Sequence, residues 1–278
     1  MTIEVLAPAK INLTLHVTGQ RTDGYHELDS LVVFTDVGDR LTLKEEDELN
    51  VEISGPFALK LDLSDDNLVM RAARLMASKK GARIKLEKNL PVSSGIGGGS
   101  SDAAATMRGL ASLWQTDVPA DVTSLGADVP VCLRAAPTRM RGIGDVLDEV
   151  PSLPPSWLVL VNPGVAVSTP KIFSMLRNKE NAPMPDELPD LGSTADFAAW
   201  LGWMRNDLEA PAMLAQPVIA TVLSALRAQK GCLLARMSGS GATCWGLFDN
   251  PEIAQRAADI IADERPGWWV QVSEITPT

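Results

Sequence analysis

Apolar and polar residues alternate along the opening part of the chain, which is the pattern of strands that bury one face. The clearest case is residues 11–17, where Asn12, Thr14 and His16 fall on the polar face. A turn-rich segment at 18–26 leads to a second predicted strand at 28–34. Further strands are predicted at 41–44 and 49–54.

The spacing then becomes helical. Asp65, Asp66 and Asn67 predict a helix start, because their side chains can cap a helix N-terminus, and Gly81 is predicted to end this helix in a left-handed conformation. Residues 83–87 alternate again as a strand, and 103–114 form a second predicted helix. The apolar face of the first helix consists of Leu68, Ala72, Leu75 and Met76.

A proline-rich stretch at 150–156 predicts a domain boundary, with one domain at 1–153 and another at 154–278. Strands are predicted beyond it at 157–161, 242–248 and 268–272. Helices are predicted from Thr169, around 195–203 and 218–229, and at 252–262. Residues 181–193, rich in prolines and acids, predict a mobile loop.

Charge excludes some classes of partner. The net charge is −10, and it is spread evenly, with −6 before residue 154 and −4 after it. No basic segment is available for nucleic acid or an anionic membrane. Lys10 interrupts the only early apolar stretch, and no run approaches the ~20 apolar residues of a membrane span, so the sequence predicts a soluble cytoplasmic protein.

The scarcity of histidine, tyrosine and cysteine limits the kinds of site that the chain can form. The chain has 2 histidines, His16 and His26, and 1 tyrosine, Tyr25, which argues against a histidine metal cage. The 3 cysteines, Cys132, Cys232 and Cys244, lie in apolar runs, so buried thiols in a reducing compartment are expected.

Residues 95–101, Gly-Ile-Gly-Gly-Gly-Ser-Ser, directly precede the second predicted helix. Glycines expose backbone N–H groups, Ser100 or Ser101 is a good N-cap, and a helix N-terminus attracts anions, so this segment predicts a phosphate site. A P-loop is excluded because no lysine follows the glycines. The dinucleotide-binding fingerprint matches only weakly, because Ser100 stands where its third glycine is required. The alternative to a phosphate site is a flexible turn before a helix.

Four other features carry candidate chemistry. Lys10 lies at the entry to an apolar strand, and Asp128 stands between small residues ahead of an apolar run. Asp128 could act as a carboxylate base, and the ammonium of Lys10 could keep that carboxylate ionised. The simpler interpretation of Lys10 is an exposed lysine at the end of a strand. A second glycine loop, 237–243, is either an anion site or a turn. Tyr25 and His26, side by side in a polar loop, suggest stacking on a flat ligand.

In this order the segments resemble the GHMP family of small-molecule kinases over nearly the whole chain. Residues 91–104 resemble the family's ATP loop, 237–243 its third motif and 7–13 its first. Residues 10–12, 21–26, 125–130 and 205–209 are similar to members whose acceptor is a cytidine-diphosphate-linked methylerythritol, an isoprenoid precursor.

The resemblance implies a mixed α/β fold of the α+β type. It consists of an N-terminal ribosomal-protein-S5-domain-2-like domain and a C-terminal ferredoxin-like domain, with ATP and substrate in the cleft between them. ATP would be the co-substrate, Mg²⁺ is expected with it, and no dedicated metal cage is implied. The protein would act as a monomer or weak homodimer, without a nucleic-acid or membrane partner.

The resemblance also implies residue roles. Asp128 would take the proton of the acceptor's 2-hydroxyl as it attacks the γ-phosphorus, and Lys10 would keep Asp128 ionised and offset charge. Tyr25 and Phe173 would sandwich the cytosine, and His26 would hydrogen-bond it. The remaining polar groups of the substrate would be held by Asn12, Thr169, Gly239 and Ser240. ATP would be bound by Asn67, Lys88, Pro91, Gly95, Gly97, Gly98, Gly99, Ser100, Ser101 and Asp102.

Other hypotheses stay open at this point. Another acceptor, such as homoserine, mevalonate or a sugar, would keep the fold but need no aromatic clamp. A non-catalytic nucleotide sensor or an RNA-binding module would belong to a different class, and the uniform acidity and the presence of Lys10 and Asp128 argue against both. The chain also departs from the family pattern, being short at 114–125 and after Phe173.

Overall fold

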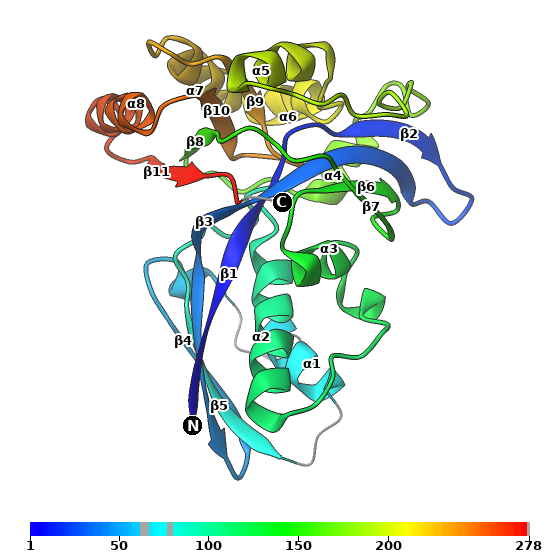
Figure 1. The fold of residues 1–278 in the computed structure, drawn as a ribbon, viewed down its shortest axis with the longest axis vertical. Coiled ribbons are helices and arrows are strands. Elements are labelled where there is room, and N and C mark those ends of the chain that lie inside the picture. Colours follow the sequence, from blue (N-terminus) through cyan, green and yellow to red (C-terminus); the bar gives the residue numbers. More distant parts are fainter. Residues whose placement is uncertain (62–66, 77–79, 277–278) are drawn as a thin grey trace. The chain divides into compact units, whose positions relative to one another are not determined.

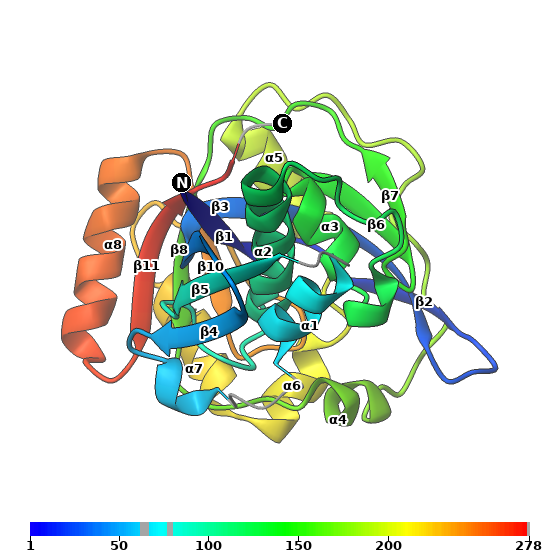
Figure 2. The same ribbon diagram turned by 90° about the horizontal axis from the view of Figure 1, so that it is seen from below.

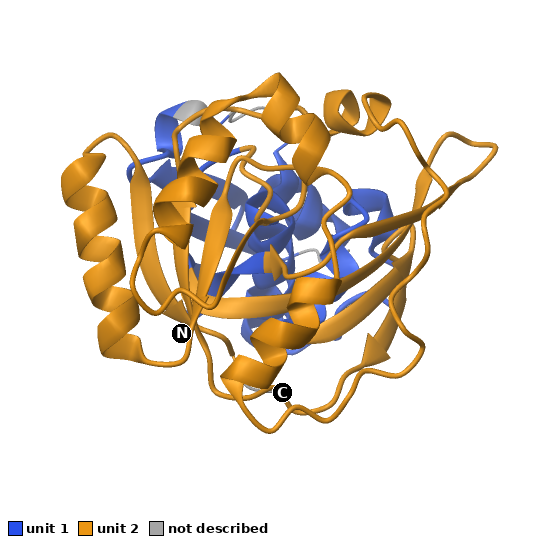
Figure 3. Ribbon diagram, turned by 90° about the horizontal axis from the view of Figure 1, so that it is seen from above, with its two compact units in different colours: residues 1–10, 38–92, 97–135 blue, residues 11–37, 93–96, 136–278 orange. Residues whose placement is uncertain are grey.

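The computed structural model describes residues 1–61, 67–76 and 80–276. The chain divides into two compact units, coloured in Figure 3. Unit 1 contains residues 1–10, 38–92 and 97–135, and unit 2 contains residues 11–37, 93–96 and 136–278. Because the units interleave in sequence, they follow a different division from the predicted boundary after residue 153, which stays a prediction.

Unit 1 packs helices on one face of a sheet (Figures 1 and 2). Strand β5 (Gly81–Glu87) pairs in parallel with β4 (Leu49–Ser54) and antiparallel with the second part of β3 (His26–Glu46). Helices α1 (Leu68–Leu75), α2 (Gly98–Trp114) and α3 (Val129–Arg134) belong to the same unit, with short 3₁₀ turns at Ala58–Lys60 and Thr123–Leu125. The core joins Leu43 and Ile84 of the sheet to Met107 and Leu110 of α2.

Unit 2 contains an antiparallel sheet in the order β11-β8-β10-β9. These strands are β8 (Trp157–Asn162), β9 (Leu234–Met237), β10 (Cys244–Phe248) and β11 (Trp269–Glu274). Helix α7 (Val218–Arg227) follows β8 in the chain, and α8 (Pro251–Glu264) links β10 to β11, flanking that sheet edge in Figure 2. This order is ferredoxin-like, as the family resemblance implied.

The rest of unit 2 surrounds the first part of β3. That strand pairs with β2 (His16–Gln20) and β6 (Thr138–Gly142), and β6 pairs with β7 (Val146–Glu149). Strand β1 (Thr2–Asn12) passes from unit 1 into unit 2 at residue 11. Helices α4 (Thr169–Ser174), α5 (Thr194–Trp203) and α6 (Glu209–Ala215) complete the unit.

Most predicted elements are confirmed, with three differences. The strand predicted at 11–17 breaks after Asn12, and its polar residues Asn12, Thr14 and His16 are all buried, because hydrogen bonds to neighbouring segments satisfy them. The strands predicted at 28–34 and 41–44 are one strand, β3. Gly81 does not end a helix but begins β5, and α1 ends at Leu75.

Several short elements were not predicted. They are β6, β7, β9, α3 and α6, which have between 4 and 7 residues each and too few positions to show a period. Asn67 caps α1 by accepting a hydrogen bond from the Val69 amide, as predicted, whereas Asp65 and Asp66 lie outside the described residues. Within the described part of the chain, no helix is long and apolar enough to cross a membrane.

Candidate active site

Lys10 and Asp128 form an ion pair in unit 1. Lys10 is near the end of β1 and its side chain is 5% exposed, while Asp128 is the residue before α3 and is 33% exposed. Their Nζ and Oδ2 atoms are 3.0 Å apart. The Asp128 side chain does not cap α3, so the carboxylate is directed to Lys10 instead of to the helix backbone. The structure therefore brings together the two residues predicted to be catalytic.

The glycine-rich segment leads into α2. Residues 93–96 belong to unit 2, and Gly97 onward belongs to unit 1. The N-cap of α2 is Gly97, which has a positive φ of 63°. The prediction that Ser100 or Ser101 caps this helix is therefore wrong. The helix starts earlier because Gly98 and Gly99 already adopt helical geometry, and the Ser101 hydroxyl donates to the Pro8 carbonyl at 2.7 Å.

Lys10 runs alongside this first turn of α2. A Cβ atom on Gly97 would lie 3.1 Å from both Cβ and Cε of Lys10, so a side chain there would crowd the lysine, and the φ of 63° also favours glycine. Four N–H groups at a helix start lack helical partners, and the positive end of the helix dipole is there too. Unit 1 thus places a lysine, a carboxylate and an anion-attracting helix N-terminus next to one another.

Two predicted ATP residues, Lys88 and Asp102, are buried in unit 1 and bonded to each other. The Lys88 ammonium donates to Asp102 Oδ2 at 2.6 Å and also to Asp39, which was not predicted. Their side chains are 2% and 4% exposed. Asn67 is the cap of α1, and Pro91 is buried just beyond β5. Their roles in ATP binding stay predictions.

In unit 2 the second glycine loop is joined to Asn12. The Ser238 hydroxyl accepts the Asn12 amide hydrogen at 3.0 Å and donates to the Gly95 carbonyl at 2.9 Å. A Cβ atom on Gly239 would lie 3.4 Å from Asn12 Oδ1. The hydroxyls of Thr169 and Ser240 are 2.7 Å apart. The predicted acceptor residues Asn12, Thr169, Gly239 and Ser240 therefore form one cluster.

The segment 205–209 supports this loop. The side-chain amide of Asn206 donates to the carbonyls of Met237 and Gly239 at 2.8 and 2.9 Å. Glu209 accepts the Met237 amide hydrogen at 2.9 Å. These contacts explain a motif that the sequence singled out only by resemblance.

Tyr25 and Phe173, the residues predicted to sandwich the cytosine, both lie in unit 2. The rings of His26 and Phe173 stack with centroids 4.7 Å apart, whereas the Tyr25 side chain is 60% exposed. Burial, assisted by the charge of Lys179, lowers the pKa of His26, which keeps the imidazole neutral at pH 7. Its Nε2 atom is buried and has no hydrogen-bond partner among the described residues.

Sequence reasoning missed a support beneath Asn12. Ser30, fully buried on β3, accepts a hydrogen bond from Asn12 Nδ2 at 2.8 Å and donates its own hydrogen to the Thr14 carbonyl. Because the only hydroxyl hydrogen is used, Ser30 can bond Asn12 solely as an acceptor, so the Asn12 NH₂ group is turned toward Ser30. The available signal was a small polar residue directly before the apolar run 31–34.

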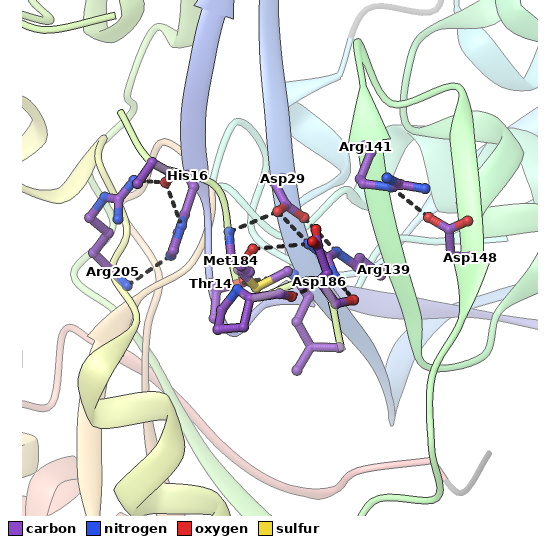
Figure 4. Close-up of polar contacts among 12 residues, drawn as sticks. Thr14, His16, Asp29, Arg139, Arg141, Asp148, Met184, Asp186 and Arg205 are labelled. Atoms are coloured by element: carbon purple, nitrogen blue, oxygen red, sulfur yellow. Dashed lines mark hydrogen bonds and ion pairs between the residues drawn. The ribbon is translucent and has the colours of Figure 1, made fainter. Parts of the chain in front are cut away.

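The first part of the loop predicted as mobile at 181–193, residues 181–186, is fastened to the rest of unit 2 (Figure 4). Arg139 donates to both oxygens of Asp29 and to the carbonyls of Pro185 and Asp186, and Asp29 accepts the Met184 amide hydrogen at 2.8 Å. Two residues earlier in the loop, the Ala182 carbonyl accepts from His16 Nδ1, because His16 Nε2 accepts the Arg205 amide hydrogen.

The three cysteines lie outside these clusters. Cys132 and Cys244 are buried, Cys232 is half-buried, and all three are free, as predicted. Burial raises the pKa of Cys232 to about 11, so its thiol is unreactive at neutral pH. Among residues 1–61, 67–76 and 80–276, no group of three or more His, Cys, Asp or Glu side chains could hold a metal ion.

Comparison with known proteins gives the family. The family model "GHMP kinases N terminal domain" matches residues 67–147, and "GHMP kinases C terminal" matches residues 187–266. A 4-diphosphocytidyl-2-C-methyl-D-erythritol kinase from Cereibacter sphaeroides is 58% identical to this chain, over 96% of the chain and 97% of the relative. The chain belongs to the GHMP kinases. It is therefore an ATP-dependent small-molecule kinase, with the two-domain α/β fold of that family.

Other members of this kinase family agree. A protein of the same name from Ruegeria pomeroyi is 57% identical, over 97% of this chain and 98% of the relative. A crystal structure of a 4-(cytidine 5'-diphospho)-2C-methyl-D-erythritol kinase superposes with a TM-score of 0.77 at 34% identity, covering 99% of this chain and 100% of that one. A homoserine kinase from Cytophaga hutchinsonii, at 16% identity and a TM-score of 0.66, shares the fold.

Proposed function

We propose that this kinase transfers the γ-phosphoryl group of ATP to the 2-hydroxyl of 4-diphosphocytidyl-2-C-methyl-D-erythritol, a step in isoprenoid precursor synthesis. The observation that carries the proposal is the identity of more than half of the residues, over nearly the full length, with kinases named for that substrate. The aromatic pair of His26 and Phe173, next to exposed Tyr25, supports a nucleobase-bearing acceptor.

The first turn of α2 binds the ATP phosphates. Gly97, Gly98 and Gly99 carry no side chains that would block an approaching oxyanion, and the free N–H groups of the helix start donate to it. ATP arrives as its Mg²⁺ complex. Mg²⁺ commonly keeps waters and binds through substrate phosphates with few carboxylates, which fits a chain whose described residues form no metal cage.

Asp128 accepts the proton of the attacking hydroxyl. Its carboxylate is a third exposed, which leaves it accessible to a substrate, and Lys10 is 3.0 Å away. Lys10 orients Asp128 and offsets the negative charge of the transferring phosphoryl group. Positioning and electrostatic stabilisation supply most of the catalysis in such transfers, and Asp128 adds the proton acceptor.

The acceptor is held by unit 2. Asn12, Thr169, Gly239 and Ser240 bond its polyol and diphosphate groups, and their contiguity in the structure supports a single binding surface. Tyr25 and Phe173 stack on cytosine. His26, neutral at pH 7, hydrogen-bonds the base. We place the reaction in the cytoplasm, where the free thiols stay reduced, and assign the protein as a monomer or weak homodimer.

A panel of acceptors tests the proposal. ADP release is measured with 4-diphosphocytidyl-2-C-methyl-D-erythritol, homoserine, mevalonate and galactose, each with MgATP. We expect the cytidylyl substrate to raise ADP release at least a hundredfold above the rate without acceptor, and the other three to leave it near that rate. Stimulation by another alcohol, with none by the cytidylyl compound, would move the kinase to a different acceptor class.

A further inference from the structure

A buried charge cluster lies directly beneath the start of α2. It consists of Asp39 on β3, Lys88 just after β5, and Asp102 in α2, and no side chain of the three is more than 4% exposed. Lys88 donates to a carboxylate oxygen of each aspartate. Two carboxylates and one ammonium would give the cluster a net negative charge if both acids were ionised.

The two carboxyl groups are not equivalent. Both oxygens of Asp39 accept hydrogen bonds. Its Oδ1 accepts from the backbone N–H of Asn89 and from that of Leu90, the latter at 2.8 Å, and its Oδ2 accepts from the Lys88 ammonium. Asp102 receives only Lys88, and its Oδ1 is buried without a hydrogen-bond partner among the described residues. An anionic oxygen in that position is costly, so the proton belongs on Asp102.

The cluster contacts the segment that binds phosphate. A Cβ atom on Gly98 would lie 3.2 Å from Lys88 Nζ, so the ammonium sits against the first residue of α2. Asp102 is four residues further along the same helix, and its carbonyl accepts the Thr106 hydroxyl at 2.8 Å. Movement of Lys88 or Asp102 would therefore move the first turn of α2.

We propose that Asp39, Lys88 and Asp102 are positioning residues for ATP binding, that Asp102 acts in its neutral form, and that loss of its proton weakens the binding of ATP. This inference rests on the proposed use of the first turn of α2 for the phosphates. When Asp102 is neutral, the negative charge of Asp39 and the positive charge of Lys88 cancel, and the Asp102 carboxyl group donates its hydrogen toward Asp39. When Asp102 ionises, a negative charge appears beneath the anion site and the contact between the carboxyl groups becomes repulsive.

The pKa directions agree with this geometry. Burial and, to a smaller extent, the nearby Asp39 raise the pKa of Asp102 to about 8 against the lowering effect of Lys88. Burial lowers the pKa of Lys88, but the two neighbouring carboxylates together outweigh it and raise the pKa, so the ammonium stays charged. Burial raises the pKa of Cys132 on α3, on which the charge of Asp102 also acts, so far that this thiol is neutral throughout. Asp102 is thus the member of the cluster that titrates.

The size of the effect follows from linkage. If only the protonated form binds well, the apparent Kd of an ATP analogue scales as one plus the ratio of ionised to neutral Asp102. With a pKa of about 8, that factor rises about tenfold between pH 7 and pH 9. An exposed acid would be ionised throughout this range and would give no change.

The test is equilibrium binding of a non-hydrolysable ATP analogue with Mg²⁺, without any acceptor, at pH 7 and pH 9. We expect a Kd ratio of about ten for the unmodified protein and for the control Asp117→Asn, which removes an exposed carboxylate beyond the end of α2. For Asp102→Asn, which cannot ionise, the ratio should fall below about two. A flat profile in the unmodified protein, or a tenfold rise that persists in Asp102→Asn, overturns the proposal.

Asp39→Asn provides a second variant in case Asp102→Asn does not fold. With Asp39 uncharged, one cause of the raised pKa of Asp102 is removed while Lys88 still lowers it, so Asp102 ionises at a lower pH and the Kd ratio should fall below that of the unmodified protein. A ratio that stays near ten contradicts the shared-proton account. Because no acceptor is present, this result is independent of the acceptor panel, and either hypothesis can fail while the other stands.

Discussion

Replacing Asp128 by Asn removes the proposed proton acceptor with little change in shape. The amide oxygen keeps an acceptor near Lys10 Nζ, which lies 3.0 Å from the native Oδ2, but the negative charge and the basicity are gone. The affinity for ATP should change little, because the backbone N–H groups at the start of α2 remain. The change therefore isolates the proton-transfer role of one side chain.

Two magnitudes separate catalysis from stability in this variant. A positioned general base contributes about 10²–10⁴-fold to the rate, which corresponds to about 3–5 kcal/mol of activation free energy. The gross attraction between unit charges 3.0 Å apart is about 5 kcal/mol at an effective dielectric constant of ~20, before desolvation is subtracted. Because Asp128 is a third exposed, we expect a net loss of only about 1 kcal/mol in the free energy of unfolding.

The assay measures kcat with saturating MgATP and acceptor, together with the Kd of an ATP analogue and the denaturant midpoint. We expect kcat of Asp128→Asn to fall at least a hundredfold while the Kd changes less than threefold. Asp128→Glu is the matched control: it keeps the charge one methylene further out and should retain more activity than the amide. A folded Asp128→Asn protein with kcat within threefold of the unmodified enzyme would refute the assignment of the base.

Three further variants test the acceptor surface. Phe173→Ala should raise the acceptor KM about tenfold and leave the KM for ATP unchanged, since stacking on a base is worth about 1–3 kcal/mol; equal changes in both KM values would contradict the clamp. Ser30→Ala should raise the acceptor KM several-fold by freeing the Asn12 amide, seen in steady-state kinetics; an unchanged KM would remove Ser30 from the account. Gly239→Ala places a Cβ atom on a residue with a φ of +54° and within 2.7 Å of the Gly95 carbonyl oxygen. It should therefore lower the free energy of unfolding by about 1–3 kcal/mol. The control Gly192→Ala, where a Cβ atom would have nothing within 4 Å, should leave that free energy unchanged.

Local chemistry was readable from the sequence because it depends on neighbouring residues. The glycines at 97–99 lie at the start of α2, where the sequence placed a helix N-terminus, and the position of Asp128 at an element's edge is confirmed. The anion-binding roles of these glycines and of the loop at 237–243 stay predictions. Strands and helices with a full period were found for the same reason. The proximity of Lys10 and Asp128 was implied only through the family resemblance.

The remainder depends on contacts between distant segments. Asp39 is 49 residues from Lys88, and nothing local distinguishes it from the surface acids that surround it in the sequence. The polar residues Asn12, Thr14 and His16 looked like an exposed strand face, yet they are buried because Ser30, Leu31 and Arg205 supply hydrogen-bond partners. Such satisfaction of buried polar groups is a property of the tertiary fold and leaves no periodic trace.

The most direct test of the central claim is the identity of the phosphorylated product. In 2-C-methylerythritol the second carbon carries a methyl group and no hydrogen, so a phosphate on its oxygen cannot show three-bond coupling to a carbinol hydrogen. After turnover with MgATP, the ³¹P NMR spectrum of the product should contain one new phosphomonoester signal without such coupling, beside an intact diphosphate. A phosphomonoester coupled to carbinol hydrogens, or no new signal while ATP is consumed, would contradict phosphorylation of the 2-hydroxyl.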